Sequence, residues 1–443
     1  MKELKMDVEI SSFIDFTKYE GKEITLTGSI QNIRVLAWGG FIILRCNTYM
    51  VQCVAAKESV NIEDLAVESV IKITGVLRTA TIKDKSIIPH NYEVDIKSIE
   101  VISKPYINAL PVDTTKKELN VALDTKFDLR PLTLRHPKQR AIFKIQSVIF
   151  NEFGAYLTKL GFNRICSPKI VFSGAEGGAN IFQMDYFKRK AYLNQSPQFY
   201  KQMMVGVFGR VFEEAPVFRA EKHDTSRHLN EYISLDFEMM LKTGFEDLIV
   251  VESNVLAHIF DVIRETCKYE IELLEINVPI MNKIVTMKFE EVHKIVFQNY
   301  NKDFRGEKDL APEEEQLICD YVKKTYNTEF VFVSHYPMEK RPFYTMEDKN
   351  DPGYSMSFDL LFRGLEITTG GQRLNKYEDY VERMTKLDMN IDSFDSFLQT
   401  FKYGMPPHGG LGLGLERLTA QICGLANVKE ASLFPRDINR LTP

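Results

Sequence analysis

Short runs of alternating apolar and polar residues dominate the first hundred positions of the chain. This period of two is typical of half-buried strands. A short helical pattern at Ser59–Ala66 lies between the third and fourth runs. Five strands with a helix at that point are the plan of an OB-fold barrel, and another small β-barrel is the alternative. The predicted strands are Glu23–Ile30, Gly40–Arg45, Met50–Ala55, Ser69–Leu77 and Val94–Val101.

The pattern changes after about residue 105. Residues 106–136 are rich in Pro, Thr, Asp and Lys and have no sustained periodicity, which predicts a linker between a first domain at 1–105 and a second at 137–443. Lys138–Leu160 then carries apolar side chains at helical spacing and ends before Gly161. This spacing predicts a long amphipathic helix at the start of the second domain.

Strands follow one another in the second domain without regular crossover helices, which favours an antiparallel sheet in an α+β domain. A small helical insertion is expected near 271–336, and no chemistry is evident there. The predicted strands are Arg189–Leu193, Arg210–Phe218, Tyr232–Leu241, Ser355–Phe362 and Leu365–Thr369. The predicted helices are Pro197–Gly206, Phe245–Tyr269, Tyr377–Lys386, Ser393–Tyr403 and Gly412–Cys423.

Composition narrows the class of protein. With 443 residues, 44% of them hydrophobic and 26% charged, the chain has the profile of an ordinary globular protein of two or more domains. It contains no apolar run near the roughly 18 residues of a membrane span. A net charge of -5 excludes a generally basic nucleic-acid coat. Six scattered cysteines without a C-x-x-C pair argue against a zinc site or a disulfide framework, so we expect a cytoplasmic protein.

A dense set of charges follows the predicted strand that ends in VFRAE. A planar guanidinium matches a phosphate with two hydrogen bonds, so Arg219 is suited to an α-phosphate. The alternative is an ion-pair ladder on an exposed hairpin. The charged residues of this strand pair and its loop are Arg219, Glu221, Arg227, His228 and Asp236.

Four glycines precede the last predicted helix in GGLGLGLERL, residues 409–418, and Arg417 lies in the first turns of that helix. Glycines let a backbone approach a flat or anionic ligand, and a helix start favours negative charge. The segment matches neither the dinucleotide fingerprint nor a P-loop. Alone, this segment is weak evidence for a ligand-binding site.

Two further clusters carry polar side chains. Asp359 and Glu366 are predicted on adjacent strands, where two hard oxygen donors suit Mg²⁺ on a nucleotide phosphate. The segment QSPQFYKQ, residues 195–202, places two amides and Lys201 at a strand-to-helix turn. It forms either a polar pocket wall or only a helix start with Pro197 at its first position.

Taken in order, ICSPKI, FRAE with its charged loop, and GLGLGLERL resemble the three motifs of class II aminoacyl-tRNA synthetases. The chain is most similar to the aspartyl family of archaeal and eukaryotic type, through AEGGANIF, QSPQFYKQ, FRAEKHDTSRHLNE, RGLEITTGGQR, YGMPPHGGLGLGLERL and LFPRDINRLTP. The resemblance covers essentially the whole chain. It implies an OB-fold that reads the tRNA anticodon, a catalytic domain built on a six-stranded antiparallel sheet flanked by helices, and a homodimer formed around Pro168.

The resemblance also implies two reactions in one site: L-aspartate and ATP give aspartyl-adenylate, and the aspartyl group then passes to the 3′ end of tRNA(Asp). Arg219 and Arg417 are the expected catalytic residues, with Mg²⁺ held by Asp359, Glu366 and Thr369. The expected ATP-binding residues are Arg219, Glu221, Arg227, His228, Tyr232, Glu366, Gly412, Gly414 and Arg417. Those expected to bind aspartate are Lys201 and Arg373 for its side chain, and Glu176, Gln198 and Asp236 for its ammonium group.

Three residues of the barrel match positions that bind the central anticodon base in this family: Arg34, Phe41 and Gln52. The chain departs from the pattern at Cys46, where an aspartate is usual, and at Ser29, where a tryptophan is usual. These departures bear on the third anticodon base, and they make charging of tRNA(Asn) as well as tRNA(Asp) an open alternative.

Other functions fit the sequence less well than that of the aspartyl family. Asparaginyl-tRNA synthetases share the three motifs but lack the lysine of QSPQFYKQ, which is present here as Lys201. A lysyl enzyme needs carboxylates where this pocket has cations. A catalytically silent paralogue, acting as a binding module, is disfavoured because no charged position of the ATP site is replaced. An adenylate-forming asparagine synthetase would lack the N-terminal barrel.

Overall fold

The computed structural model describes residues 16–46, 49–58, 60–84, 86–107, 109–172 and 180–443. The chain divides into two compact units. The first extends to Ala141 and takes in Glu272–Glu275, and the second contains Ile142–Ile271 and Ile276–Thr442. The division falls within the first turns of a long helix, just beyond the predicted linker.

The first unit contains a closed five-stranded barrel in the order β1-β2-β3-β5-β4, which confirms the predicted OB-fold plan. Burial alternates along its strands, and Ile42 and Leu44 of β2 are fully buried. Residues 60–66 form turns and not the predicted helix, because the Asn61 side chain accepts a hydrogen bond from the Glu63 amide at 2.9 Å. The strands are β1 Glu23–Leu36, β2 Gly39–Cys46, β3 Tyr49–Ala56, β4 Val70–Thr79 and β5 Tyr92–Ser103.

An eight-stranded sheet forms the centre of the second unit, in the order β12-β13-β14-β15-β16-β11-β10-β6. The six strands from β13 to β10 are antiparallel, as expected, and the short edge strands β12 and β6 pair in parallel. Its strands are β6 Asn163–Arg164, β10 Arg210–Phe218, β11 Glu231–Met240, β12 Thr286–Lys288, β13 Phe330–Ser334, β14 Ser357–Phe362, β15 Leu365–Gln372 and β16 His408–Gly414. A separate small sheet contains β7 Ile170–Val171, β8 Gln183–Tyr186 and β9 Arg189–Leu193.

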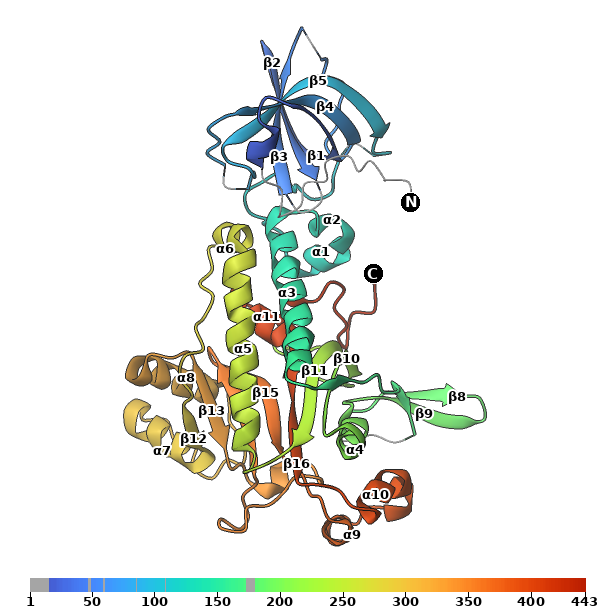
Figure 1. Cartoon of the computed structure of the whole chain (residues 1–443), viewed down its shortest axis with the longest axis vertical. Helices are drawn as coiled ribbons and strands as arrows, with labels where there is room; N and C mark the ends of the chain where they lie inside the picture. Colours follow the sequence, from blue (N-terminus) through green and yellow to red (C-terminus); the bar gives the residue numbers. More distant parts are fainter. Residues whose placement is uncertain (1–15, 47–48, 59, 85, 108, 173–179) are drawn as a thin grey trace. The chain divides into compact units, whose positions relative to one another are not determined.

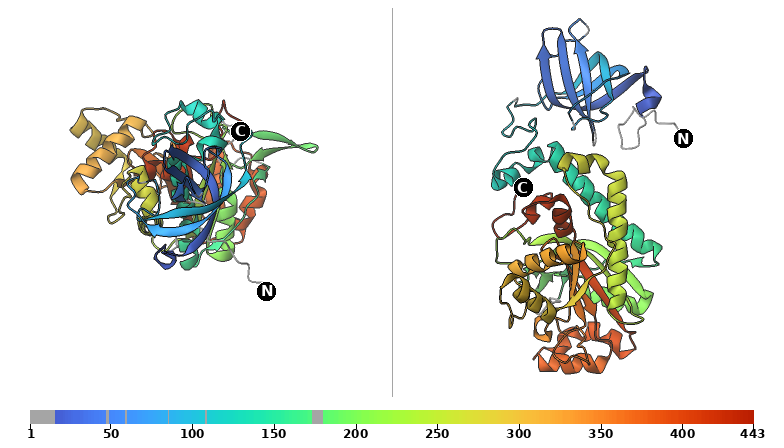
Figure 2. Two further views of the ribbon diagram at one scale, coloured as in Figure 1. Left: turned by 90° about the horizontal axis from the view of Figure 1, so that it is seen from above. Right: turned by 90° about the vertical axis from the view of Figure 1, so that its left-hand side faces the viewer.

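Two long helices, α3 and α5, lie side by side along one face of this sheet (Figures 1 and 2). The rings of Tyr156 and His258 stack at 4.7 Å between them, and Phe153 of α3 packs against Phe212 of β10. Because α3 and α5 cover this face, the opposite face of the sheet is available for a binding site. The helices are α1 Leu123–Asp128, α2 Arg130–Thr133, α3 Pro137–Lys159, α4 Gln198–Phe208, α5 Glu246–Thr266, α6 Lys268–Leu274, α7 Phe289–Tyr300, α8 Pro312–Tyr326, α9 Tyr377–Lys386, α10 Asp395–Lys402 and α11 Leu415–Cys423.

The structure departs from the sequence prediction in two segments of the second unit. The helix predicted at Gly412–Cys423 begins only at Leu415, as α11, and the glycine-rich stretch before it forms the central strand β16, paired with both β15 and β11. A Cβ atom on Gly410 would lie 2.1 Å from the Phe237 carbonyl oxygen and 2.2 Å from Glu238 Oε2, so only glycine fits there. The segment at 271–336 contains α7 and α8 but also β12 and β13, which extend the main sheet.

No helix in the described part of the chain is long and apolar enough to cross a membrane. All six cysteines lie in the described ranges and carry free thiols.

Candidate active site

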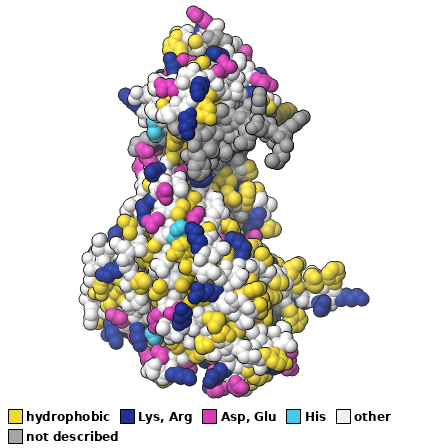
Figure 3. All heavy atoms as spheres, viewed as in Figure 1, with side chains coloured by type: hydrophobic (Ala, Val, Ile, Leu, Met, Phe, Trp, Pro, Cys, Tyr) yellow, Lys and Arg dark blue, Asp and Glu magenta, His cyan; other side chains and the backbone are white. Residues whose placement is uncertain are grey.

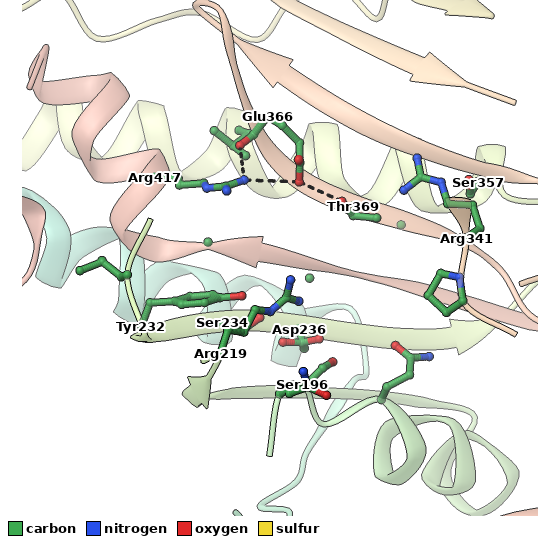
Figure 4. A pocket seen from close by; sticks show the side chains of 18 of the residues that line it. Ser196, Arg219, Tyr232, Ser234, Asp236, Arg341, Ser357, Glu366, Thr369 and Arg417 are labelled. Carbon is green, nitrogen blue, oxygen red and sulfur yellow. Dashed lines mark hydrogen bonds and ion pairs between the residues drawn. The ribbon is translucent and has the colours of Figure 1, made fainter. Parts of the chain in front are cut away.

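A cavity of about 400 Å³ opens on the uncovered face of the sheet. Its walls come from the β10–β11 hairpin, β15, β16, the first turn of α4 and α11 (Figure 4). Glu176, predicted to bind the ammonium group, lies outside the described residues. The predicted residues that line the cavity are Gln198, Lys201, Arg219, Glu221, Arg227, His228, Tyr232, Asp236, Glu366, Thr369, Arg373, Gly412, Gly414 and Arg417.

One end of the cavity holds a buried network of two cations and two carboxylates. Lys201 Nζ donates to Asp236 Oδ1 at 2.7 Å and lies 3.4 Å from Glu238 Oε2, and Arg373 Nε donates to Glu238 Oε1 at 2.9 Å. Burial alone would raise the pKa of Glu238, but Arg373 and Lys201 outweigh it and hold the pKa of this carboxyl below its ordinary value. The four side chains therefore fix one another in place.

The two buried cations at this end, Lys201 and Arg373, are paired with the carboxylates of Asp236 and Glu238. Asp236 Oδ2 is buried and has no hydrogen-bond partner among the described residues. An unpaired carboxylate oxygen beside two cations suits a small ligand that carries both an ammonium group and an extra carboxylate.

Arginines lie on both sides of another part of the cavity. Figure 4 shows Arg417 and Glu366 on one side of the cavity and Tyr232 and Arg219 on the other. The Arg219 guanidinium lies 6.0 Å from the centre of the Tyr232 ring. Arg417 donates to the Glu366 carbonyl oxygen at 2.9 Å. A planar ring between an aromatic face and a guanidinium gains stacking and cation–π contacts, so this part suits a nucleobase.

Two carboxylates lie on adjacent strands: Glu366 lines the cavity, whereas Asp359, predicted to bind the metal, is not among the described residues that line it. Thr369 of β15, opposite Asp359 of β14, donates to Glu366 Oε1 at 2.9 Å. Arg341 donates to Asp359 Oδ2 at 2.9 Å, whereas Asp359 Oδ1 is buried without a partner among the described residues. Burial raises the pKa of Asp359 to about 6 against the effect of Arg341, and Arg417 and Thr369 outweigh burial to lower the pKa of Glu366.

The β10–β11 loop supplies the remaining cationic wall. Arg227 Nη2 donates to Glu315 Oε2 on α8, and the His228 ring nitrogen Nδ1 lies 2.6 Å from Thr225 Oγ1. Burial lowers the pKa of His228, and the nearby Arg417 lowers it further. Burial also raises the pKa of Glu315 to about 7, against the effect of Arg227.

The family model described as tRNA synthetases class II (D, K and N) matches residues 122–438. The chain belongs to the class II aminoacyl-tRNA synthetases. It is 42% identical to an aspartate–tRNA(Asp/Asn) ligase of Deinococcus radiodurans over 97% of this chain and 98% of that protein. It is 41% identical to a protein of the same name from Thermus thermophilus, over 97% and 99%. A solved asparaginyl-tRNA synthetase of Pyrococcus horikoshii, complexed with asparaginyl-adenylate, superposes with a TM-score of 0.87 at 29% identity, over 96% of this chain and 97% of that one.

The synthetase has site residues that sequence reasoning missed. Arg341 bonds Asp359, and Glu416, with a pKa raised by burial to about 8, accepts the Ile233 amide at 3.1 Å. Glu238 was not predicted as a site residue, although it lies two residues after Asp236 and therefore on the same face of β11. Glu315 lies in the acidic run of a segment to which no chemistry was assigned.

The barrel of the synthetase brings its three predicted anticodon residues onto one face. Arg34 of β1 lies opposite Phe41 of β2, and Gln52 of β3 lies opposite Ile43, two residues after Phe41. The half-exposed Trp38, which sequence reasoning also missed, packs edge-on against Phe41 at 5.3 Å. Gln52 donates to Glu93 at 2.6 Å.

Proposed function

We propose that this synthetase is an aspartate–tRNA ligase that charges both tRNA(Asp) and tRNA(Asn). The observation that carries the choice of amino acid is the pair of buried cations, Lys201 and Arg373, at one end of the cavity, because they can hold the side-chain carboxylate of aspartate, which asparagine lacks. The two curated relatives described above are named for both tRNAs, which supports the second part of the proposal.

The first reaction forms aspartyl-adenylate. The α-carboxylate oxygen of aspartate attacks the α-phosphorus of ATP, and pyrophosphate leaves. Lys201 and Arg373 hold the β-carboxylate, while Asp236 and Gln198 hold the ammonium group. Arg219 binds the α-phosphate as negative charge concentrates on its oxygens, and Arg417 and Tyr232 fix the adenine ring beside Glu221. Positioning and electrostatic stabilisation therefore supply most of the rate enhancement.

Magnesium fits the carboxylates beside the phosphate path. Mg²⁺ is usually held by one or two carboxylates together with substrate phosphates. Asp359 has a buried oxygen without a partner among the described residues, and Glu366 lies on the next strand with Thr369 between them. We assign these three residues to the ion, which when bound neutralises phosphate charge. Gly412 and Gly414 keep the neighbouring backbone open to the nucleotide.

The second reaction passes the aspartyl group to the tRNA. The 3′-terminal ribose hydroxyl attacks the adenylate carbonyl carbon, and AMP leaves. In the barrel, Phe41 stacks on the central anticodon base and Arg34 and Gln52 bond its edge. Ser29 and the buried Cys46 provide no large or charged side chain to discriminate the third base.

A homodimer is also part of the proposal, and the cytoplasm is the compartment we propose. Exposed apolar side chains gather on the small sheet that follows Pro168, and Figure 3 shows hydrophobic side chains on its projecting hairpin. Exposed patches of this kind mark protein interfaces. The most exposed members are Ile170, Phe172, Met184, Tyr186 and Phe187.

Charging of separate tRNA transcripts tests the proposal. With labelled aspartate, both tRNA(Asp) and tRNA(Asn) should be charged at matched concentration and salt, because no described residue of the barrel is assigned to exclude either third base. Labelled asparagine should charge neither. If tRNA(Asp) is charged and tRNA(Asn) is not, the proposed breadth is wrong.

A Phe41→Ala variant provides the matching control for the barrel. Loss of one stacked base costs about 1–3 kcal/mol, so charging of both tRNAs should weaken by a similar factor. Exchange of pyrophosphate into ATP, which needs no tRNA, should stay at the level of the unsubstituted enzyme. A variant that weakens only one tRNA would contradict a shared central-base contact.

A further inference from the structure

Helix α8 places one carboxylate against Arg227 and Glu366, two residues that line the active-site cavity. Its first turn contains three consecutive glutamates with different surroundings. Glu313 is exposed and pairs with Lys302 at 2.8 Å, whereas Glu314 is fully buried against His293. Only 9% of the Glu315 side chain is exposed, and it points toward the active-site strands. The segment at 271–336, to which the sequence assigned no function, thus contributes a buried glutamate to the catalytic unit.

Glu315 joins two parts of the phosphate end. Its Oε2 atom accepts hydrogen bonds from Arg227 Nη2 on the β10–β11 loop and from the Glu366 amide on β15, the latter at 3.2 Å. The Glu366 carboxylate is itself held by Thr369 at 2.9 Å and lies 3.4 Å from Arg417. The carboxylate of Glu315 therefore ties the loop arginine to the strand that carries the proposed magnesium ligand.

This contact constrains Arg227 without using up its donors. A guanidinium has five N–H donors, and Glu315 occupies one edge of it. The side chain still lines the cavity and is about one-fifth exposed. A long arginine on a loop loses orientation unless a partner holds it, and planar bidentate recognition of phosphate depends on that orientation.

We propose that Glu315 is a positioning residue that orients Arg227 toward the outer phosphates of ATP. This inference rests on the proposed function, which places the polyphosphate at this end of the cavity. Glu315 acts through Arg227 and does not touch the reacting atoms. A purely structural ion pair would instead lower stability without a selective effect on ATP. If the Glu315 carboxylate instead competed with ATP for Arg227, it would weaken ATP binding, and its removal would strengthen that binding.

Variants of three residues distinguish these roles in pyrophosphate exchange, with ATP affinity measured in parallel by calorimetry. Glu315→Ala should raise the KM for ATP between about 10- and 100-fold, the range expected when a catalytic group is misplaced by about 1 Å. The KM for aspartate should stay within about twofold. Glu315→Gln, which keeps an acceptor oxygen, should recover most of the loss. Glu313→Ala, the matched control on the same helix turn, should behave like the unsubstituted enzyme.

A double-mutant cycle with Arg227→Ala completes the test. If Glu315 acts through Arg227, Glu315→Ala should change the KM and Kd for ATP by less than about twofold in the Arg227→Ala background. An equal effect in both backgrounds, an unchanged KM for ATP or a tighter affinity for ATP would overturn the inference. Failure of the unsubstituted enzyme to exchange pyrophosphate would contradict the proposed function instead, and the calorimetric cycle would still decide the role of Glu315.

Discussion

Replacing Lys201 by Met should raise the KM for aspartate by roughly 30- to 4,000-fold, which corresponds to about 2–5 kcal/mol for breaking a buried, hydrogen-bonded charge pair. The side chain is 1% exposed and bonds Asp236 at 2.7 Å. Its loss removes one of the two cations for the β-carboxylate and leaves Asp236 and Glu238 with one cation between them. Affinity for ATP, measured by calorimetry, should change only a few-fold.

Stability should fall in the same variant. Breaking a buried ion pair by removing one partner costs about 3–5 kcal/mol of unfolding free energy. Lys386→Met is the matched control, because Lys386 pairs with Glu382 at 2.6 Å on an exposed helix surface, where such a pair should add little to stability. Equal losses of ATP and aspartate affinity in the Lys201 variant would place this lysine outside the amino-acid pocket.

Glu366→Ala should abolish pyrophosphate exchange, with a loss greater than about 100-fold. Removing a magnesium ligand forfeits several kcal/mol of phosphate charge stabilisation, and each 1.36 kcal/mol corresponds to a factor of ten in rate. The carboxylate also holds Thr369 and Arg417 beside the nucleotide. Because about one-third of the side chain is exposed, the free energy of unfolding should fall by less than the about 3–5 kcal/mol expected for breaking a fully buried ion pair.

Glu339→Ala controls for the loss of a carboxylate, since Glu339 is exposed and pairs only with Lys308 among the described residues. This variant should exchange pyrophosphate at the normal rate. Full exchange by the Glu366 variant at every magnesium concentration would show that the ion is held elsewhere.

The strands were predictable where a single face is buried. β10 begins and ends where the alternating pattern places it, since a sheet covered on one side by α3 and α5 imposes that alternation. β16 was not predictable, because glycine is depleted in strands and reads as a turn. The glycine at 410 is required by a neighbour that only the fold brings close: a Cβ on Gly410 would lie 2.1 Å from the Phe237 carbonyl oxygen.

The site was predictable where its residues lie within recognisable segments. Lys201, Arg219 and Glu366 each belong to such a segment and line one cavity. Glu315 and Arg341 lie far along the chain from the residues that they contact, and neither has a local pattern that indicates burial. A charged residue in a loop or in a helical first turn usually indicates solvent exposure, and here only the tertiary structure reverses that expectation.

The most direct test of the central claim is tRNA-independent pyrophosphate exchange with each amino acid in turn. The buried cations Lys201 and Arg373 should accept the side-chain carboxylate of aspartate and reject asparagine, whose neutral amide brings no negative charge to them. We expect aspartate to support exchange and asparagine at the same concentration to support none. Exchange stimulated by asparagine and not by aspartate would contradict the account.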